Sequence, residues 1–377
     1  MRILHIISSG GMYGAEAVIL NMSRMLNESG HTSVLGVFAN SSNPNLQLHE
    51  AAKREGIESH VIPCSGQMDR GVGGRIRRLV VETGVDVVHA HGYKADIYGF
   101  MALRGRGVAL VSTCHNWLND GMFVAFYGVV DRWVLRGFAG VVAVSEEVRE
   151  TLLGSGVEGE KVRLIRNGID LRPFDEADPV LRRERGLDGR LVVGIVGRLS
   201  VEKGMDIFLR AAAEVLKEVP DAVFVIAGDG PEREALEGLI DSLQLGESVM
   251  MLGRREDMPG IYASVDVLVS ASRKEGLPMT ILEGMASGRA WVATAVGDVP
   301  TVVRDGETGV LVAAGDVGGL AAAVVSLLRD RERRQALGEA GRRLVEEEFS
   351  AQRMTADYLS MYASVAGKDR LVPGVGR

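Results

Sequence analysis

The sequence lacks several features that would place it in a membrane or outside the cell. Its 377 residues contain no apolar run of 18 or more, so no membrane-spanning helix is expected. The only two cysteines, Cys64 and Cys114, fit neither a disulfide framework nor a zinc knuckle. The N-terminus enters an apolar, strand-like run at residues 2–8 without a signal-peptide pattern. Together these absences favour a cytoplasmic protein.

An excess of basic residues is also missing. Residues 1–175 carry no net charge, so the formal charge of −7 falls in the second half. Nucleic-acid binders are usually basic, and no nucleic-acid partner is expected. Small basic clusters do occur, at Arg70, Arg75, Arg77, Arg78, Arg104 and Arg106. They fit a solvated helix face; the alternative is peripheral attachment to the inner face of an anionic membrane or to a lipid acceptor.

Short apolar runs alternate with amphipathic segments along the chain. In the first half the runs predicted as strands are residues 3–8, 33–38, 86–90, 109–113 and 140–144. In the second half they are residues 191–197, 222–227, 248–252, 266–270, 290–294 and 308–312. Near-continuously apolar strands separated by helices are typical of parallel sheets covered on both faces. We therefore predict an α/β protein with two doubly wound, Rossmann-like domains that face a cleft.

The predicted domain boundaries follow from composition. Residues 172–190 are rich in charge and contain Pro173 and Pro179, so we interpret them as a linker. They separate a first domain, residues 1–171, from a second, residues 191–349. A last helix is predicted at residues 350–366.

The segment from Glu275 to Glu283 is the most informative part of the chain. Pro278 suits the first turn of a helix, and Gly288 suits its end. The helix between them is largely apolar, so Glu283 in its middle needs a partner or loses its charge. Glu275 precedes the helix, beside N–H groups that favour anions. Two carboxylates and a helix N-terminus on one spot suit a ligand with hydroxyls and negative charge, such as a sugar nucleotide.

Arg198 and Lys203 form a second candidate group, on a glycine-punctuated turn that leads from a predicted strand into a helix. Two fixed cations there would stabilise the charge on a departing nucleoside diphosphate. The alternative is surface charge. A lysine at a helix start is electrostatically unfavourable unless an anion lies near it, which favours the first interpretation.

The motifs resemble those of a known family over nearly the whole chain. Glu275 and Glu283 resemble the paired glutamates of retaining glycosyltransferases of family 4 (glycosyl transferases group 1), which have the GT-B fold. The segments 197–204, 228–231, 167–170 and 10–16 resemble other landmarks of the family, in the expected order. In that family the last helix crosses back to the first, acceptor-side domain, and residues 350–366 match it.

The resemblance implies roles for individual residues. His115, Arg198, Lys203 and Glu275 match the catalytic group, in which Glu275 contacts the donor sugar and His115 lies beside it. Glu283 matches the residue that holds the ribose. The remaining donor-binding positions are Gly11, Gly14, Gly197, Gly228, Arg254, Gly276 and Leu277. For Gly228 and Arg254 a purely structural turn is an equal alternative, and Glu275 and Glu283 also fit buried ion pairs with Lys274 or Arg254.

All seven histidines lie in the first 115 residues, and His89, His91 and His115 cluster in the sequence. His89 and His91 are spaced like metal ligands, but the sequence offers no clear third ligand, so we expect no metal site and no cofactor beyond the donor substrate. His91 fits either the acceptor side of a site or a structural role at a strand end. His89 is expected to pack in the core. Glu16 is interpreted as a first-turn helix charge rather than a contact to the cleft.

The predicted function is transfer of a sugar from a nucleotide-sugar donor to an acceptor hydroxyl, with retention and without metal. Cell-surface polysaccharide, glycolipid or small glycoside synthesis would use such an enzyme. The alternatives are a GT-B epimerase or phosphorylase, and a non-catalytic nucleotide-sugar-binding module. The chain departs from the family pattern at residues 287–291. It departs again at Thr301, a position where the family usually has glutamate. Both departures are expected to lie away from the diphosphate site.

Overall fold

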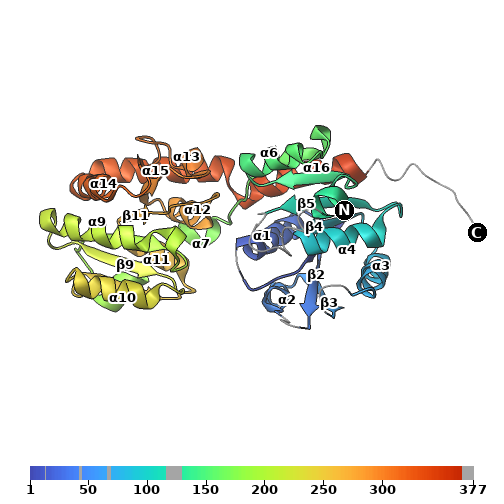
Figure 1. Ribbon diagram of the computed structural model, residues 1–377, viewed down its shortest axis with the longest axis horizontal. Helices are drawn as coiled ribbons and strands as arrows, with labels where there is room; N and C mark the ends of the chain where they lie inside the picture. Colours follow the sequence, from blue (N-terminus) through green and yellow to red (C-terminus); the bar gives the residue numbers. More distant parts are fainter. Residues whose placement is uncertain (13, 42–44, 66–68, 116–129, 367–377) are drawn as a thin grey trace, which may run out of the picture. The chain divides into compact units, whose positions relative to one another are not determined.

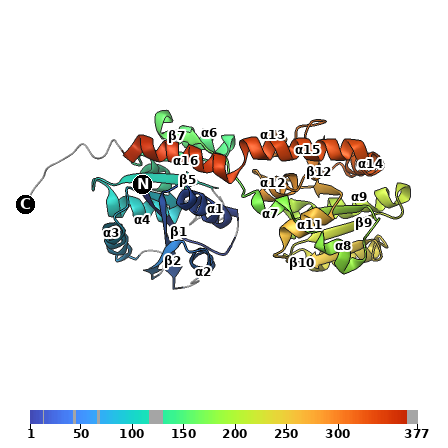
Figure 2. The ribbon, with the colours of Figure 1, turned by 180° about the vertical axis from the view of Figure 1, so that it is seen from behind.

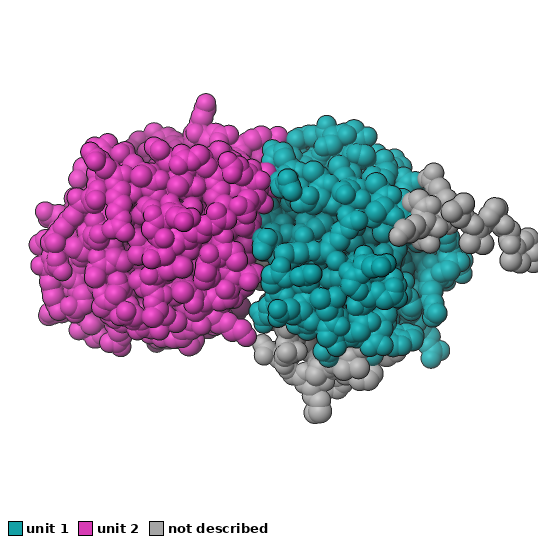
Figure 3. Space-filling model, turned by 90° about the horizontal axis from the view of Figure 1, so that it is seen from above, with its two compact units in different colours: residues 1–168, 351–377 teal, residues 169–350 magenta. Residues whose placement is uncertain are grey.

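The computed structural model describes residues 1–377 except 13, 42–44, 66–68, 116–129 and 367–377. The chain divides into two compact units (Figure 1). Unit 1 comprises residues 1–168 together with 351–377, and unit 2 comprises residues 169–350 (Figure 3). Each unit is built on its own parallel sheet. No described helix is long and apolar enough to cross a bilayer.

Unit 1 contains a seven-stranded parallel sheet in the order β3-β2-β1-β4-β5-β6-β7. Its strands are β1 (Arg2–Ile7), β2 (Thr32–Asn40), β3 (Glu58–Cys64), β4 (Val87–His91), β5 (Ala109–Cys114), β6 (Gly140–Ala143) and β7 (Val162–Leu164). Its helices include α1 (Gly14–Glu28), α2 (Gln47–Arg54), α3 (Val72–Thr83), α4 (Tyr93–Leu103), α6 (Glu146–Gly154) and α16 (Ala351–Ala366). Although α16 is the last helix, it packs on α1 and β5 (Figure 2).

Unit 2 contains a six-stranded parallel sheet in the order β10-β9-β8-β11-β12-β13. Its strands are β8 (Val192–Val196), β9 (Val223–Ala227), β10 (Val249–Gly253), β11 (Val267–Ser270), β12 (Ala290–Thr294) and β13 (Val310–Val312). Its helices are α7 (Arg172–Asp175), α8 (Val180–Arg185), α9 (Met205–Glu218), α10 (Arg233–Ser242), α11 (Met258–Ser264), α12 (Met279–Ala286), α13 (Val299–Val302), α14 (Val317–Arg329) and α15 (Arg331–Glu348). The predicted fold class, two doubly wound parallel sheets, is confirmed.

Each sheet is covered on both faces, as near-continuously apolar strands require. In unit 2, α9, α10 and α14 bury one apolar cluster against the sheet, and α11, α12 and α15 bury another on the opposite face. Trp291 on β12 is fully buried in the second cluster. Rigid, doubly covered strands hold the loops at their carboxyl ends in fixed positions, and these loops carry the predicted site residues.

Residues 172–190 belong to unit 2 rather than forming a linker. They contain α7 and α8, and the side chains of Leu181 and Leu187 are buried in the unit 2 core. Arg182 donates a 2.6 Å hydrogen bond to Asp266, which also receives the backbone N–H of Val192 at the start of β8. The charged composition suggested a linker, but two leucines and a half-buried ion pair fix the segment on the domain.

Candidate functional site

The loops of unit 2 converge where the strand order reverses. In the sheet, β8 lies beside β11, so the chain leaves these two strands toward opposite sides, and ligands of open α/β sheets bind at the carboxyl ends of such a strand pair. Gly197 and Arg198 follow β8, and the segment 271–278 follows β11. The next loops along the sheet carry Gly228 after β9 and Arg254 after β10. The predicted donor-side residues of unit 2 therefore share one edge of one sheet.

Close backbone contacts hold these loops together. The N–H of Gly197 donates to the carbonyl of Ala227 at 3.0 Å, and the N–H of Gly228 donates to that of Gly253 at 2.9 Å. Gly228 has φ of +147°, and a Cβ there would lie 1.8 Å from the Gly197 carbonyl oxygen. Only glycine fits that approach. The close backbone approach therefore explains why residue 228 is glycine, without any contact to a ligand.

Lys203 and Glu275 form an ion pair across the switch point. The Lys203 ammonium lies 2.5 Å from Oε1 of Glu275, and their side chains are 24% and 10% exposed. Ser272 donates a second hydrogen bond, of 2.7 Å, to the same oxygen. This pairing differs from the alternatives weighed from the sequence, Lys274 and Arg254. It also supplies the anion that a lysine before a helix needs, so Lys203 does not by itself require a ligand.

Several donors at this edge are left unused. The Arg198 guanidinium is exposed and has no hydrogen bond or ion pair within the described part of the chain. Among the same residues, the backbone N–H groups of Gly276 and Leu277, just before α12, donate to no acceptor. A guanidinium and free N–H groups at a helix start are suited to bind phosphate oxygens. Arg254 is also exposed.

Glu283 lies in the middle of α12, as predicted, and finds a partner there. The hydroxyl of Tyr262, on α11, donates a 2.8 Å hydrogen bond to Oε2 of Glu283. Burial raises the pKa of the Glu283 carboxyl, and the Tyr262 hydrogen bond partly opposes that rise. The other carboxylate oxygen has no partner among the described residues and is available to ligand hydroxyls.

The loop after β12 packs against the backbone of Glu275. Gly297 has φ of +51°, and a Cβ there would lie 1.8 Å from the Glu275 carbonyl oxygen. This loop therefore supports the segment that carries Glu275, and the expectation that it lies away from the diphosphate site stays a prediction. Thr301, at the departure itself, donates its hydroxyl to the Asp298 carbonyl at 2.7 Å and serves the local turn.

In unit 1 the glycine loop follows β1 and leads into α1. Gly11 donates its N–H to Oγ of Ser9 at 3.3 Å, and that hydroxyl contacts Oε1 of Glu16 at 2.9 Å. Glu16 lies in the first turn of α1, as predicted, and its side chain is buried. Gly14 is the first residue of α1. Glu16 thus anchors the loop that carries both predicted glycines.

The histidines of unit 1 meet on the sheet face that α16 covers, and sequence reasoning missed one of them. His5, in the middle of β1, joins His91 at the end of β4 through a 3.1 Å contact between Nδ1 and Nε2. His91 in turn contacts Nε2 of His115, just beyond β5, at 3.2 Å. Burial lowers the pKa of His5 to about 3 and that of His115 to about 4, and it lowers that of His91 as well. All three rings are neutral near pH 7.

His89 is buried, as predicted, and belongs to a separate hydrogen-bond network. Its Nδ1 lies 2.7 Å from the hydroxyl of Tyr362, and its Nε2 lies 2.7 Å from the hydroxyl of Thr113. Tyr358 lies 2.9 Å from the same threonine hydroxyl. Both tyrosines belong to α16, so this network ties the C-terminal helix to the sheet.

The cluster contains the third potential metal ligand that the sequence did not reveal. One nitrogen each from His5, His89 and His91 falls within a 4.8 Å group. However, the protein already provides partners for both nitrogens of His89 and of His91, and for Nδ1 of His5. A metal would have to break these contacts, so the donor set fits a hydrogen-bonded network better than a metal centre.

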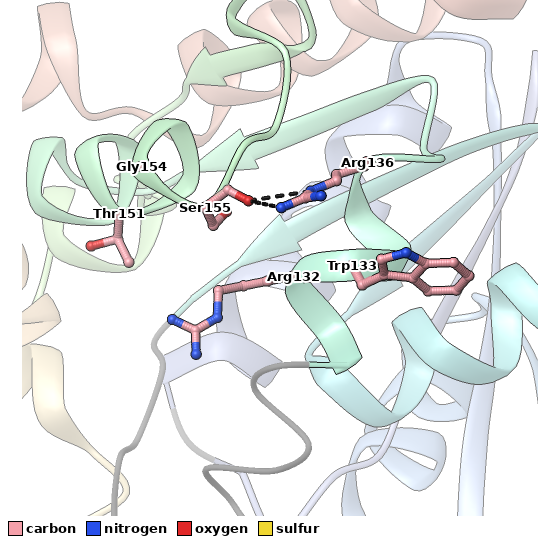
Figure 4. A pocket seen from close by; sticks show the side chains of 6 residues that line it. All are labelled: Arg132, Trp133, Arg136, Thr151, Gly154 and Ser155. Atoms are coloured by element: carbon pink, nitrogen blue, oxygen red, sulfur yellow. Dashed lines mark hydrogen bonds between the residues drawn. The ribbon is translucent and has the colours of Figure 1, made fainter.

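A hollow of about 580 Å³ in unit 1 lies outside these groups (Figure 4). Arg132, Trp133 and Arg136 line one side of it, and the end of α6 with Ser155 lines the other. The Arg136 guanidinium is engaged there with the Ser155 carbonyl, at 2.6 Å. None of the predicted site residues lines this hollow.

Comparisons with known proteins agree with this geometry. Residues 12–172 match the model of "Glycosyltransferase Family 4", and residues 190–330 match that of "Glycosyl transferases group 1". N-acetyl-alpha-D-glucosaminyl L-malate synthase of Bacillus anthracis is 26% identical, over 97% of this chain and 96% of that protein. Alpha-D-kanosaminyltransferase of Streptomyces kanamyceticus is 35% identical, over 70% of this chain and 73% of that protein.

Solved structures share the fold. The crystal structure of Anabaena HepE in complex with UDP has a TM-score of 0.84 and 23% identity, covering 97% of this chain and all of that one. Sucrose-phosphate synthase from Thermosynechococcus elongatus has a TM-score of 0.76 and 20% identity, covering 97% and 99%. The chain therefore belongs to glycosyltransferase family 4, adopts the GT-B fold and is an enzyme that transfers a sugar from a nucleotide-sugar donor.

Proposed function

We propose that this glycosyltransferase works with retention of anomeric configuration and without a metal ion, transferring a hexosyl group to an acceptor hydroxyl. The observation that carries the proposal is the Lys203–Glu275 pair at the β8–β11 switch point. It stands beside Arg198 and the N–H groups of Gly276 and Leu277, none of which has a partner among the residues that the structure describes. This edge of the sheet places two cations and free N–H donors close to the Glu275 carboxylate.

The proposed division of labour follows from those contacts. Arg198, Lys203 and the two N–H groups would bind the diphosphate and stabilise the charge that grows as it leaves. A same-face displacement assisted by that leaving group requires no enzyme nucleophile. Glu275 would contact a hydroxyl of the transferred sugar through the oxygen that Lys203 and Ser272 do not occupy. Fixed cations supply the stabilisation that a divalent metal would otherwise give.

The remaining residues hold the nucleoside and the acceptor. Glu283 would accept the ribose hydroxyls, while Gly197, Gly228 and Arg254 would line the edge nearest the base. In unit 1, Gly11 and Gly14 would let backbone approach the donor phosphate. His115 would donate to a sugar hydroxyl or phosphate, and His91 would support the acceptor side.

The acceptor class is proposed from the relatives. The B. anthracis enzyme is named for L-malate, and another relative, from a Mycobacterium species, is a D-inositol 3-phosphate glycosyltransferase. We propose a small hydroxylated acceptor of this type, with a lipid-linked or polysaccharide acceptor as the second choice. The exposed Met101 and Trp133 and the arginines near them are compatible with peripheral membrane association.

The test combines donor screening with product analysis. The full chain is incubated with UDP-, GDP-, ADP- and TDP-sugars, and stabilisation of the fold identifies the donor. That donor is then paired with L-malate, inositol 3-phosphate and lipid-linked sugars, and the anomeric coupling of the product is read by proton NMR. An α-linked product from an α-linked donor supports retention, whereas a β-linked product contradicts it. Donor consumption without acceptor indicates an epimerase, phosphate-dependent cleavage indicates a phosphorylase, and binding without turnover indicates a binding module.

A further inference from the structure

Three imidazoles form a continuous chain across three strands of unit 1. His5 on β1 meets His91 at the end of β4, and His91 meets His115 beyond β5, at 3.1 and 3.2 Å between nitrogens. His5 and His91 are buried, while His115 is half-buried. The chain thus runs from the middle of the sheet to the carboxyl ends of its strands, where GT-B site residues lie.

The two hydrogen bonds that link His5, His91 and His115 must both run in the same direction. A neutral imidazole carries one N–H and one bare nitrogen, and burial keeps all three rings neutral. If His5 donates from Nδ1, then His91 must donate from Nδ1 to Nε2 of His115. If instead His115 donates from Nε2, every N–H along the chain reverses. The hydrogen bond at one end therefore sets the tautomer at the other.

An unpaired N–H group is less costly at His115 than at His5. Nε2 of His5 and Nδ1 of His115 are both buried atoms with no partner among the described residues. Whichever direction holds, one of them is an unpaired N–H and the other a bare nitrogen. An unpaired N–H costs most deep in the core, where nothing can reach it. His115 is the better place for it, because its ring is only half-buried and lies at the carboxyl end of β5 rather than in the middle of the sheet.

We propose that His5 and His91 are positioning residues that hold His115 as the Nδ1–H tautomer, so that His115 presents a hydrogen-bond donor to the substrate. The tautomer itself follows from the contacts above and holds whether or not the protein is active on a given donor. Only its catalytic consequence rests on the proposed function, in which His115 donates to a sugar hydroxyl or phosphate.

The neighbouring histidine provides a matched control. His89 pairs with His5 across the β1–β4 ladder and is equally buried, and its ring lies 4.0 Å from that of His91, centroid to centroid. Yet both of its nitrogens bond to hydroxyls of Tyr362 and Thr113, outside the chain to His115. Replacing His89 disturbs the same region of the core without interrupting the chain.

The experiment reads the tautomer directly. The full chain is labelled with ¹⁵N-histidine, and two-bond proton–nitrogen correlation spectra are recorded at neutral pH, with His115→Gln identifying the signals of His115. We expect a protonated Nδ1 and a bare Nε2 at His115. His5→Leu removes the first donor and should shift His115 toward the Nε2–H form. His5→Asn should preserve the wild-type pattern, because its amide N–H replaces the imidazole Nδ1–H, and His89→Leu should also leave it unchanged.

Turnover provides the second readout. Loss of one neutral hydrogen bond to the substrate corresponds to a roughly two- to tenfold lower kcat in His5→Leu, with recovery in His5→Asn. A wild-type His115 with its proton on Nε2, or an Nδ1–H pattern that survives His5→Leu, would overturn the proposal. An Nδ1–H pattern that depends on His5 supports the relay even when no tested donor is turned over, and in that case the proposed function alone fails.

Discussion

The ammonium of Lys203 and the carboxylate of Glu275 meet at 2.5 Å, although 72 residues separate them in the sequence. The contact joins the loop after β8 to the loop after β11, the two loops that diverge at the switch point of the unit 2 sheet. Because both side chains are largely shielded from water, each orients the other. A ligand that enters here meets a preorganised pair rather than two free side chains, which costs less rearrangement on binding.

This pair distinguishes Lys203 from Arg198 experimentally. Replacing either cation, as Lys203→Met or Arg198→Ala, should lower turnover a hundredfold or more, about 3 kcal/mol of transition-state stabilisation. Only Lys203→Met should also lower the free energy of unfolding, by about 1 kcal/mol, since it leaves the shielded Glu275 with Ser272 alone. Initial rates and denaturant unfolding measure both effects.

Lys217→Met is the control for that experiment. Lys217 lies on α9 and pairs with Glu214 on the exposed surface, so the substitution makes the same change in charge away from the switch point. It should leave turnover and stability within error. Near wild-type turnover in Arg198→Ala or Lys203→Met would contradict the diphosphate assignment.

Activity should persist in excess EDTA. The protein's own hydroxyls and imidazoles occupy five of the six ring nitrogens of His5, His89 and His91, and fixed cations serve the proposed diphosphate site. Rates are measured after chelation, and the metal content of the purified chain is measured by mass spectrometry. Loss of activity that a divalent ion restores, together with one bound metal per chain, would identify the histidine cluster as a metal centre.

The Tyr262–Glu283 contact predicts a pH-dependent stability difference. Burial raises the pKa of Glu283 above its ordinary value of 4.5, so the stability gained from its neutral form is present below pH 4.5 and is lost as pH rises through the folded pKa. The Tyr262 hydroxyl stabilises the charged form. Tyr262→Phe should therefore destabilise the protein little at pH 4 and by about 1–2 kcal/mol at pH 8. Unfolding free energies are measured across that range.

The Glu283→Gln background tests the cause of this difference. A neutral amide does not titrate, so Tyr262→Phe in that background should give the same change in stability at every pH. A pH-dependent difference that persists in the amide background would mean that another group near Tyr262 is responsible.

The apolar alternation of the sequence predicted most of the sheet, and the strands it missed are informative. The two without a predicted run are β3 and β7, which form the outer edges of the unit 1 sheet. Three residues of β3 are exposed, and β7 has only three residues. Edge strands bury one neighbour fewer, so their sequences carry a weaker apolar signal. The paired glutamates and the helix that contains Glu283 were predictable because they lie in one short segment.

The contacts that complete the candidate site were not predictable in the same way. His5 meets His91 only because β1 pairs with β4 in a particular register, with Ile7 opposite His91. Lys203 meets Glu275 only because β8 lies beside β11. A single sequence specifies which residues are apolar, but not which strand lies beside which, so partners on different strands remain ambiguous until the sheet order is known. The buried Leu181 and Leu187 were likewise too few to mark residues 172–190 as folded.

The two glutamates should fail differently when each is replaced by glutamine. Glu283 is half-buried against Tyr262, on the nucleoside side of the proposed site, so Glu283→Gln should weaken binding of the free nucleoside diphosphate and of the whole donor alike. Glu275 is held by Lys203 and Ser272 and is proposed to touch the transferred sugar. Glu275→Gln should leave diphosphate affinity nearly unchanged while turnover falls, as expected for a contact made mainly in the transition state.

Calorimetric titration with the diphosphate, alongside initial rates, separates the effects of the two glutamate substitutions. Because Lys203 loses its charged partner in Glu275→Gln, a modest gain in diphosphate affinity is also consistent with the assignment. Equal losses of affinity in both variants would instead indicate that the two carboxylates serve the fold of the switch point rather than different parts of the donor.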